Sequence, residues 1–157
     1  MEKENTDNGT GQVMPFRKGH FTPGDDPRLI GSKCKLCNTV FYPPRSICTR
    51  CFEGGVMERI ELSRRGELCS YTTVWQNIPR YRSPYMVAYV DLPEGVRVFA
   101  HLTDCDPSAL RIGMKVETVV DVLRKGGDGK DVVGYKFRPI HGDRGEGKGL
   151  EGKRLLG

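Results

Sequence analysis

The chain has 157 residues, with 25 lysines and arginines against 20 aspartates and glutamates, which gives a formal net charge of +5. This length suits one domain or two small ones. No apolar run approaches the roughly 20 residues of a membrane span, so no membrane partner is expected. The positive charge is moderate and spread along the chain, which permits a polyanionic partner but is equally typical of an ordinary solvated surface.

The N-terminal part of the chain has little capacity for regular structure. Residues 1–11 are polar and lack the apolar stretch of a secretory signal. Prolines and glycines interrupt residues 13–26, so at most a short helical turn fits at 16–20. Together with free thiols at Cys69 and Cys105, the lack of a signal leads us to expect a cytoplasmic protein.

Four cysteines follow in two Cys-x-x-Cys pairs, Cys34 with Cys37 and Cys48 with Cys51, and ten residues separate the pairs. Each pair aims two thiolates at one point. The spacer has a β-prone run, a Pro-Pro turn and a return strand, which bring the pairs together. Asn38, after the first pair, tolerates the left-handed backbone conformation needed there. We therefore predict a zinc site with four sulfur ligands in a rubredoxin-like zinc ribbon.

Two alternatives to zinc remain to be weighed. Disulfides are disfavoured, because cysteines three residues apart are poor disulfide partners outside redox motifs. Iron of the rubredoxin type uses similar sulfur ligands and is the closer alternative. With either metal, four thiolates leave no open coordination position. The metal is therefore expected to hold structure and not to activate water.

After the ribbon, the pattern changes at Gly66 to short strands separated by turn signals. Asp106 followed by a proline is a helix N-cap, so one helical turn should separate the third strand from the fourth. The five expected strands are 68–76, 85–92, 96–102, 115–123 and 132–138. This layout is that of a five-stranded OB-fold barrel, with an SH3-like barrel as the alternative.

The expected fold is thus mainly β, with a zinc ribbon followed by an OB-fold barrel. We expect a flexible N-terminal segment at 1–26, followed by the zinc ribbon at 27–62. The barrel is expected at 63–140 and a disordered glycine-rich tail at 141–157.

Short stretches along the chain, in this order, resemble one known family. They are 34–37, 41–45, 48–51, 65–68, 70–74, 84–85, 95–100, 112–116 and 137–139. The order resembles the acyl-CoA-associated zinc-ribbon/OB-fold family, long labelled a domain of unknown function, over about residues 28–139. The resemblance implies a non-catalytic small subunit that accompanies a thiolase-fold enzyme acting on acyl-CoA thioesters. Such subunits serve in archaeal mevalonate-pathway assemblies, steroid side-chain degradation and anaerobic aromatic degradation, and related members pair with hydratases.

No catalytic residue is expected in this chain. Thiolase chemistry needs a nucleophilic cysteine and groups that move protons. Cys69 lies in mid-strand, where a small buried hydrophobe is the expected role. Cys105 lies between Asp104 and Asp106, whose carboxylates should raise its pKa and weaken it as a nucleophile. The three histidines are scattered over unlike elements.

The loop at 77–84, between the first two barrel strands, is the candidate ligand site. Its prolines bracket Arg80, Tyr81 and Arg82. Arginine can hold phosphates, an aromatic ring can stack on adenine, and OB-folds commonly bind ligands with this loop. A CoA thioester carries both groups, so these three residues are the predicted CoA-binding residues. A solvated turn or the rim of a protein interface is the alternative.

The leading hypothesis is a non-catalytic, zinc-binding accessory subunit of an acyl-CoA-processing enzyme, first of all a thiolase. It would support complex formation and CoA-thioester binding, with anaerobic aromatic or steroid-type β-oxidation as candidate settings. Phe41 and Tyr42, beside Pro43, are expected to offer the partner subunit an exposed apolar surface. The alternative is a nucleic-acid-binding protein, since zinc ribbons and OB-folds both serve that role. It is disfavoured because basic and aromatic residues do not interleave over successive strands.

Overall fold

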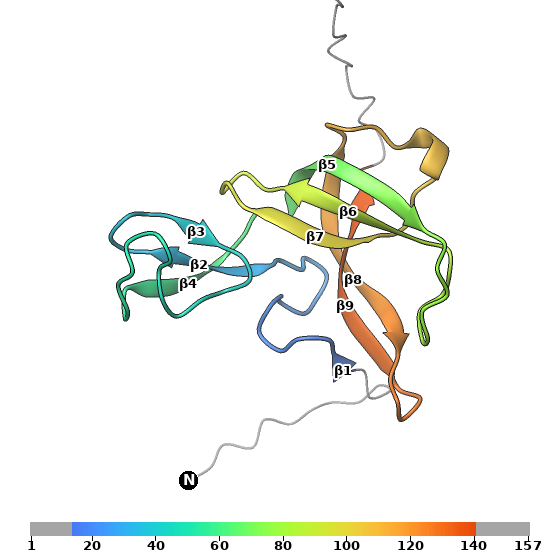
Figure 1. The fold of residues 1–157 in the computed structure, drawn as a ribbon, viewed down its shortest axis with the longest axis horizontal. Coiled ribbons are helices and arrows are strands. Elements are labelled where there is room, and N and C mark those ends of the chain that lie inside the picture. The colour runs from blue at the N-terminus through green and yellow to red at the C-terminus, as the bar shows by residue number, and fades with distance from the viewer. Residues whose placement is uncertain (1–13, 141–157) are drawn as a thin grey trace, which may run out of the picture.

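The computed structural model describes residues 14–140, which form nine strands and one short 3-10 helix arranged in two sheets (Figure 1). The expectations for residues 1–13 and for the tail at 141–157 lie outside the described residues. Within the described range, no helix has the length and apolar character needed to cross a bilayer.

The first sheet is the ribbon, with three antiparallel strands in the order β3-β2-β4. The central strand β2 (Ile30–Cys34) pairs on one edge with β3 (Val40–Phe41) and on the other with β4 (Met57–Glu61). The first cysteine pair begins at the end of β2, and the second lies in the long connection between β3 and β4. A zinc ribbon is therefore confirmed at the level of the fold.

The second sheet closes into a barrel of five strands. These are β5 (Arg65–Val74), β6 (Tyr85–Asp91), β7 (Arg97–Leu102), β8 (Lys115–Lys125) and β9 (Asp131–Pro139). The hydrogen-bonded circuit runs β5-β6-β7-β9-β8 and returns to β5, and β7 runs parallel to β9. The 3-10 helix η1 (Pro107–Ala109) lies between β7 and β8, and its N-cap is Asp106. The predicted OB-fold barrel is thus confirmed.

The structure adds pairings that the sequence did not indicate. The two-residue strand β1 (Met14–Pro15) runs parallel to the start of β9, and Phe16 N donates to Val133 O at 2.7 Å. Further along, Phe21 forms an isolated bridge with Leu29. The segment that precedes the ribbon therefore pairs with β9 of the barrel at its start and with the entry of the ribbon at its end. The expected domain boundaries at 26/27 and 62/63 stay predictions.

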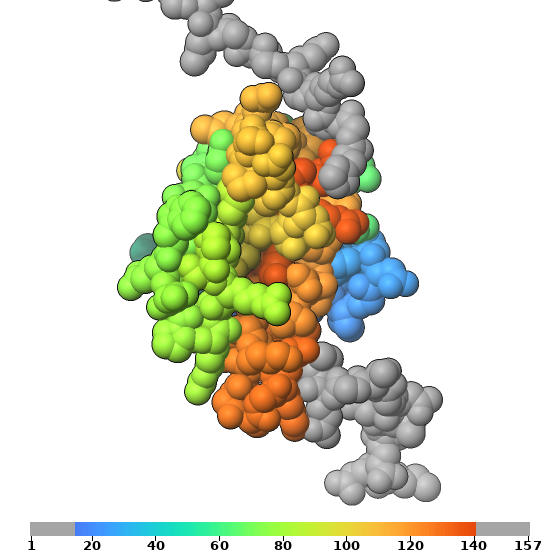
Figure 2. Space-filling view, turned by 90° about the vertical axis from the view of Figure 1, so that its right-hand side faces the viewer, coloured from blue at the N-terminus to red at the C-terminus, as the bar shows by residue number. Residues whose placement is uncertain are grey.

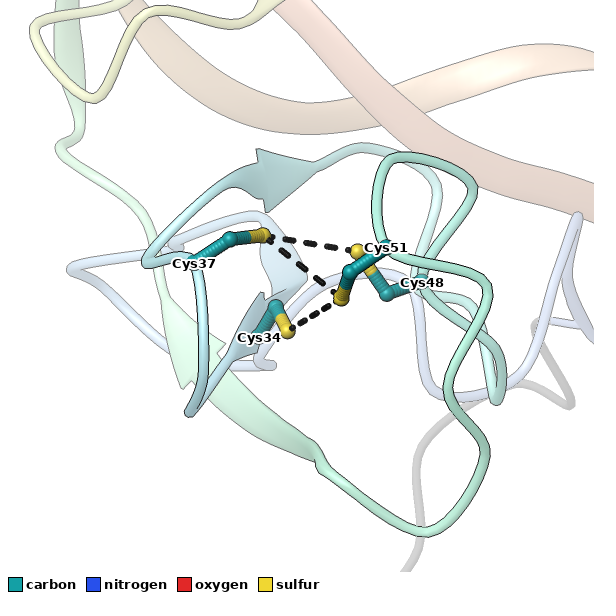
Figure 3. Close-up of side chains that lie close together, drawn as sticks. All are labelled: Cys34, Cys37, Cys48 and Cys51. Carbon is teal, nitrogen blue, oxygen red and sulfur yellow. Dashed lines mark hydrogen bonds between the residues drawn. The ribbon is translucent and has the colours of Figure 1, made fainter.

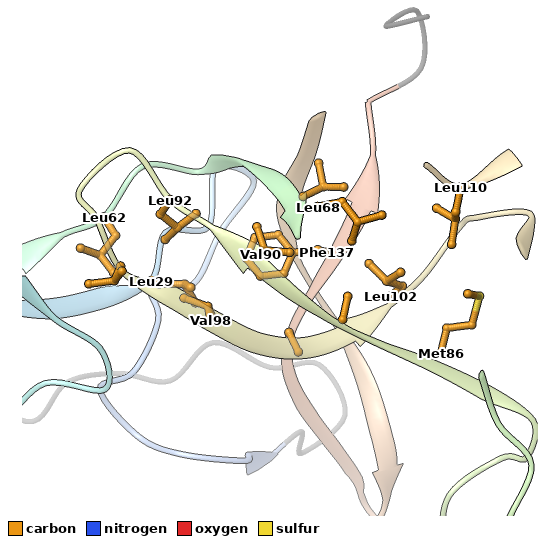
Figure 4. Close-up of a cluster of buried hydrophobic side chains, with 14 residues drawn as sticks. Leu29, Leu62, Leu68, Met86, Val90, Leu92, Val98, Leu102, Leu110 and Phe137 are labelled. Atoms are coloured by element: carbon orange, nitrogen blue, oxygen red, sulfur yellow. The ribbon is translucent and has the colours of Figure 1, made fainter. Parts of the chain in front are cut away.

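One apolar core joins the two sheets. Leu29 and Leu62, on the ribbon side, are fully buried in the same cluster as Val90, Val98 and Phe137 of the barrel (Figure 4). Leu62 N also donates to Leu29 O at 2.8 Å, which ties the entry of the ribbon to its exit. Because the cluster is continuous, the ribbon packs directly on the barrel and is not merely tethered to it.

Candidate functional sites

The four cysteine sulfurs of the ribbon lie together. All four Sγ atoms are within 4.8 Å of one another, and Figure 3 shows the side chains converging from the two loops. The Sγ–Sγ distance is 3.6 Å between Cys34 and Cys51 and also between Cys37 and Cys48. It is 4.0 Å between Cys37 and Cys51. Sulfur ligands about 2.3 Å from one tetrahedral metal ion are separated by about 3.8 Å, whereas a disulfide needs about 2 Å. The cluster therefore has the spacing of a four-sulfur metal site.

The two cysteine loops repeat one backbone geometry. In the first loop, Asn38 N donates to Cys34 O at 2.9 Å, and in the second, Phe52 N donates to Cys48 O at 2.8 Å. The residue that closes each loop has a left-handed backbone, with φ of 56° at Asn38 and 58° at Phe52. The left-handed conformation expected at Asn38 is present. The sequence did not indicate it at Phe52, because a bulky aromatic residue rarely adopts it.

The thiols of the cluster differ in acidity. Hydrogen bonds from the Thr39 side chain and backbone lower the pKa of Cys37 to about 6, and backbone N–H groups lower the pKa of Cys48. The neighbouring sulfur of Cys48 instead raises the pKa of Cys51 to about 12. Four adjacent thiolates repel one another, so full ionisation requires a cation among them. This donor set fits zinc or iron.

A second candidate site is a cleft of about 910 Å³ beside the barrel. The β5–β6 loop (75–84) lies on one side and the β8–β9 hairpin on the other, and Figure 2 shows the hollow between the yellow-green loop and the orange hairpin. Arg80, Tyr81 and Arg82 all line this cleft, so the structure brings the three predicted residues to one cavity. The Arg80 guanidinium also reaches across to Gly127 in the hairpin turn.

Three aromatic rings form a compact cluster in the cleft, in which Tyr81 also lies 5.8 Å from Tyr85. Tyr85 and His101 are stacked with centroids 5.0 Å apart and an interplanar angle of 6°, and Tyr81 stacks on His101 at 5.7 Å. Burial, and then the nearby Lys136 charge, lower the pKa of His101, which favours the neutral imidazole at pH 7. Trp75 also lines the cleft and is 75% exposed. The sequence did not single out these additional residues, because cross-strand neighbours have no common spacing along the chain.

The cations in the cleft fall into two groups. Lys125 forms an ion pair with Asp131, and Lys136 forms one with Asp121 at 2.7 Å. Arg80, Arg82 and Arg124 also line the cleft and form no ion pair within residues 14–140. These three arginines are therefore the cations available to an anionic ligand.

The two cysteines outside the cluster lie in different surroundings. Burial, followed by the charges of Asp104 and Asp106, raises the pKa of Cys105, and its Sγ lies 3.8 Å from the sulfur of Met86. Cys69 is only partly buried, contrary to expectation, because a β-bulge follows Leu68 and disturbs the alternation of the strand. Among the described residues, no hydrogen bond joins either thiol to a histidine.

The apolar surface of the ribbon differs from the expectation. Phe41 and Tyr42 were expected to be exposed, but both are partly buried. The hydroxyl of Tyr42 is fully buried, and its ring packs edge-on against Tyr135 of the barrel at 5.8 Å. The prediction is wrong for Tyr42 because the barrel covers that side of the ribbon. The large apolar side chains that the described ribbon exposes are Leu36 (62%), Ile47 (54%) and Phe52 (81%).

Comparisons with known proteins agree with this architecture. Residues 21–57 match the family model described as "ChsH2, rubredoxin-like zinc ribbon domain", and residues 59–121 match "ChsH2, C-terminal OB-fold domain". A DUF35 domain-containing scaffold protein of Methanothermobacter thermautotrophicus is 40% identical over 114 residues, which cover 71% of this chain and 86% of that protein.

Two further relatives carry names that include an enzyme. The benzoylsuccinyl-CoA thiolase subunit BbsA of Thauera aromatica is 38% identical over 117 residues, 74% of this chain and 80% of that protein. The solved structure titled "Ltp2-ChsH2(DUF35) aldolase" contains a chain with 32% identity and a TM-score of 0.55. The match covers 71% of the present chain and 84% of that one.

Proposed function

The chain belongs to the DUF35 family of proteins with a ChsH2-type zinc ribbon and OB-fold, and on this premise we propose that it is a non-catalytic accessory subunit of an acyl-CoA-processing enzyme. A thiolase is the first candidate partner. The observation that carries the proposal is the match to 80% of BbsA, whose name makes it a subunit of a thiolase for benzoylsuccinyl-CoA. Anaerobic aromatic degradation and steroid-type β-oxidation are both kept as proposed settings. The solved relative makes an aldolase the second candidate partner.

In this proposal the four ribbon cysteines, Cys34, Cys37, Cys48 and Cys51, hold one structural zinc ion. The support is the cluster of four sulfurs at tetrahedral spacing and the match to a zinc ribbon family model. A sheet of three strands, each two to five residues long, is too small to hold itself together by apolar burial alone. The metal would replace that missing core. Thiolates must stay reduced to bind it, which fits a cytoplasmic location.

We further assign the cleft beside the barrel to the nucleotide end of the CoA thioester. Arg80 and Arg82 would contact its phosphates, and Tyr81 or Trp75 would stack on its adenine. The support is that all four line one cavity and that neither arginine forms an ion pair with a described carboxylate. The acyl group would then extend from the cleft to the active site of the partner. The chain would contribute binding and orientation, and the partner the bond-making groups.

The proposal is tested by reconstitution with a thiolase-fold enzyme encoded in the same genome. The full chain alone should show no thiolytic turnover of acetoacetyl-CoA or benzoylsuccinyl-CoA, and it should form a stable complex with the enzyme in size-exclusion chromatography. Turnover by the chain alone would overturn the non-catalytic role. Failure to associate with thiolase-fold and aldolase candidates alike would overturn the subunit role.

The CoA assignment has its own test in the same complex. Arg80→Ala combined with Arg82→Ala should raise KM for the thioester about tenfold and leave kcat nearly unchanged. Phosphate contacts far from the reacting carbon are similar in ground and transition states, so their loss acts as lost uniform binding. Arg111→Ala, which removes an exposed arginine outside the cleft, is the matched control and should leave KM unchanged. An unchanged KM in the double variant would contradict the assignment.

Nucleic-acid binding, the alternative from a different class, gains one observation. Tyr89 and Phe99 are half-exposed partners on β6 and β7 with rings 5.2 Å apart, on the strands where OB-folds often stack bases. However, Arg97, beside them on β7, is held by both oxygens of Asp91 at 2.6 and 2.9 Å. A phosphate backbone requires available cations along its path, so this face does not favour the alternative. Salt-dependent binding of a single-stranded oligonucleotide, measured by fluorescence anisotropy, would support it.

A further inference from the structure

Three exposed apolar side chains belong to residues next to the clustered cysteines of the ribbon. Leu36, Ile47 and Phe52 are adjacent in sequence to Cys37, Cys48 and Cys51, respectively. Because the sulfurs of these cysteines lie within 4.8 Å of one another, the backbones of the three neighbouring residues lie at the same end of the ribbon. We call these three residues the knuckle patch. It shares no residue with the cleft beside the barrel.

Phe52 is an unfavourable residue for the isolated chain. It is 81% exposed, so its ring gains little from folding, and its φ of 58° is a conformation that bulky residues rarely adopt. The first cysteine loop meets the same backbone requirement with Asn38, which tolerates a left-handed backbone well. Folding alone would be served better by asparagine or glycine at position 52. We therefore infer a role for this phenylalanine in a contact outside the folded chain.

Charges flank the knuckle patch. Lys35 and Arg50, inside the two cysteine loops, are exposed and form no ion pair within the described part of the chain; Arg50 instead donates to the Thr39 hydroxyl at 3.3 Å. Glu53, directly after Phe52, is exposed as well. The surface thus has an apolar centre, an aromatic anchor and two cations at its edge. Protein interfaces have this composition, with aromatic and arginine residues as energetic centres.

We propose that the knuckle patch is the docking surface for a folded protein subunit. That subunit presents an apolar pocket for Phe52 and carboxylates, at the rim of the pocket, for Lys35 and Arg50. The identity of the subunit, the acyl-CoA enzyme, rests on the proposed function. A second copy of this chain fits less well, since it offers only the Glu53 carboxylate to the two cations. An anionic membrane would attract Lys35 and Arg50 but repel the Glu53 carboxylate directly beside the anchor, so it also fits less well.

The test compares Phe52→Asn with Ile112→Asn in the full chain. Ile112 is 73% exposed and lies on the barrel, so its replacement removes a similar amount of apolar surface elsewhere. Phe52→Asn should leave thermal stability unchanged or raise it, because asparagine suits the left-handed backbone. The same variant should weaken binding to the thiolase-fold enzyme of the same genome at least tenfold, as loss of an interface anchor does. Ile112→Asn should bind like the wild-type chain.

A charge-reversal variant tests the rim. Lys35→Glu combined with Arg50→Glu should slow association at low salt and reduce its salt dependence, because complementary charges act mainly on the association rate. An association rate that is unchanged in this variant would overturn the assignment of carboxylates to the partner.

The remaining outcomes separate this inference from the proposed function. Normal complex formation by Phe52→Asn would overturn the docking surface and leave the subunit role standing. No complex with the wild-type chain would overturn both. Concentration-dependent dimers in sedimentation that Phe52→Asn abolishes would replace the enzyme by a second copy. Phe52-dependent binding to vesicles containing phosphatidylserine would replace it by a membrane.

Discussion

The ribbon and the barrel differ in the length of their strands and in what they bury. The strands of the ribbon have two to five residues, and its fully buried side chains include Cys34, Cys48 and Ser32. The strands of the barrel have six to eleven residues and enclose an apolar interior. In the barrel, side chains such as Leu68 and Phe137 are withdrawn from water in contact with one another. Burial of apolar area stabilises the barrel directly. The ribbon has too few such contacts, so the order of its loops depends on what binds the sulfurs.

The two regions are not independent in spite of this difference. Leu29 and Leu62 belong to the core of the barrel although they border the ribbon, and Tyr42 of the ribbon packs on Tyr135 of β9. Loss of the metal is therefore expected to disorder the cysteine loops first and to loosen this junction second. Three changes test how far the regions depend on each other.

The largest effect is expected from Cys48→Ser. Structural zinc contributes on the order of 10 kcal/mol to small ribbons, so loss of a fully buried ligand should abolish tight binding and unfold the cysteine loops. The barrel should keep its strands, because its apolar interior does not include the cluster. Metal analysis should find one zinc per wild-type chain, and hydrogen exchange should report rapid exchange in the ribbon alone.

Cys69→Ser, at a cysteine outside the cluster, is the control for this variant and should retain the metal. Iron with a red chromophore, or well-folded wild-type protein without metal, would refute the zinc assignment. Global unfolding of Cys48→Ser would show that the barrel depends on the ribbon.

Gly66→Ala should have an intermediate effect, confined to the barrel. A Cβ at this position would lie 2.6 Å from Asp91 O and 2.7 Å from Val90 Cγ1, so β5 or β6 must shift. Overpacking of this kind costs about 1–3 kcal/mol. The matched variant Gly54→Ala, in the ribbon, meets no atom within 4 Å and should be neutral or slightly stabilising. Urea unfolding of both variants provides the comparison, and equal midpoints would contradict it.

The smallest effect is expected at the junction, from Tyr42→Phe. The Tyr42 hydroxyl is buried without a hydrogen-bond partner in the described structure, and burial raises the pKa of this phenol. Its removal should stabilise the chain by about 1 kcal/mol, since an unsatisfied buried polar group is costly. Tyr89→Phe, at an exposed tyrosine, should leave the midpoint of urea unfolding unchanged. A destabilised Tyr42→Phe would indicate that the hydroxyl has a partner.

Local patterns made much of the fold predictable from the sequence. The spacing of the cysteines was enough to bring four sulfurs together, and the cap at Asp106 placed the helical turn between β7 and β8. Alternation of apolar residues located β7, where Val98 and Ala100 are buried and Phe99 between them is exposed. In each case the signal is a short local motif or the period of a strand, and the two cysteine pairs are joined by a spacer of only ten residues. The backbone geometry then allows little else.

Contacts between segments that are distant in the sequence were decided only by the tertiary structure. The sequence indicated Tyr81 but not its stacking with Tyr85 and His101, because these rings meet only after β6 and β7 have paired. The burial of Tyr42 follows from the barrel lying against the ribbon, and the same packing leaves Phe52 exposed beside the cysteine cluster. Local sequence therefore determined which loops and strands form. The free energy of packing between remote elements determined which side chains are left for a ligand or a partner.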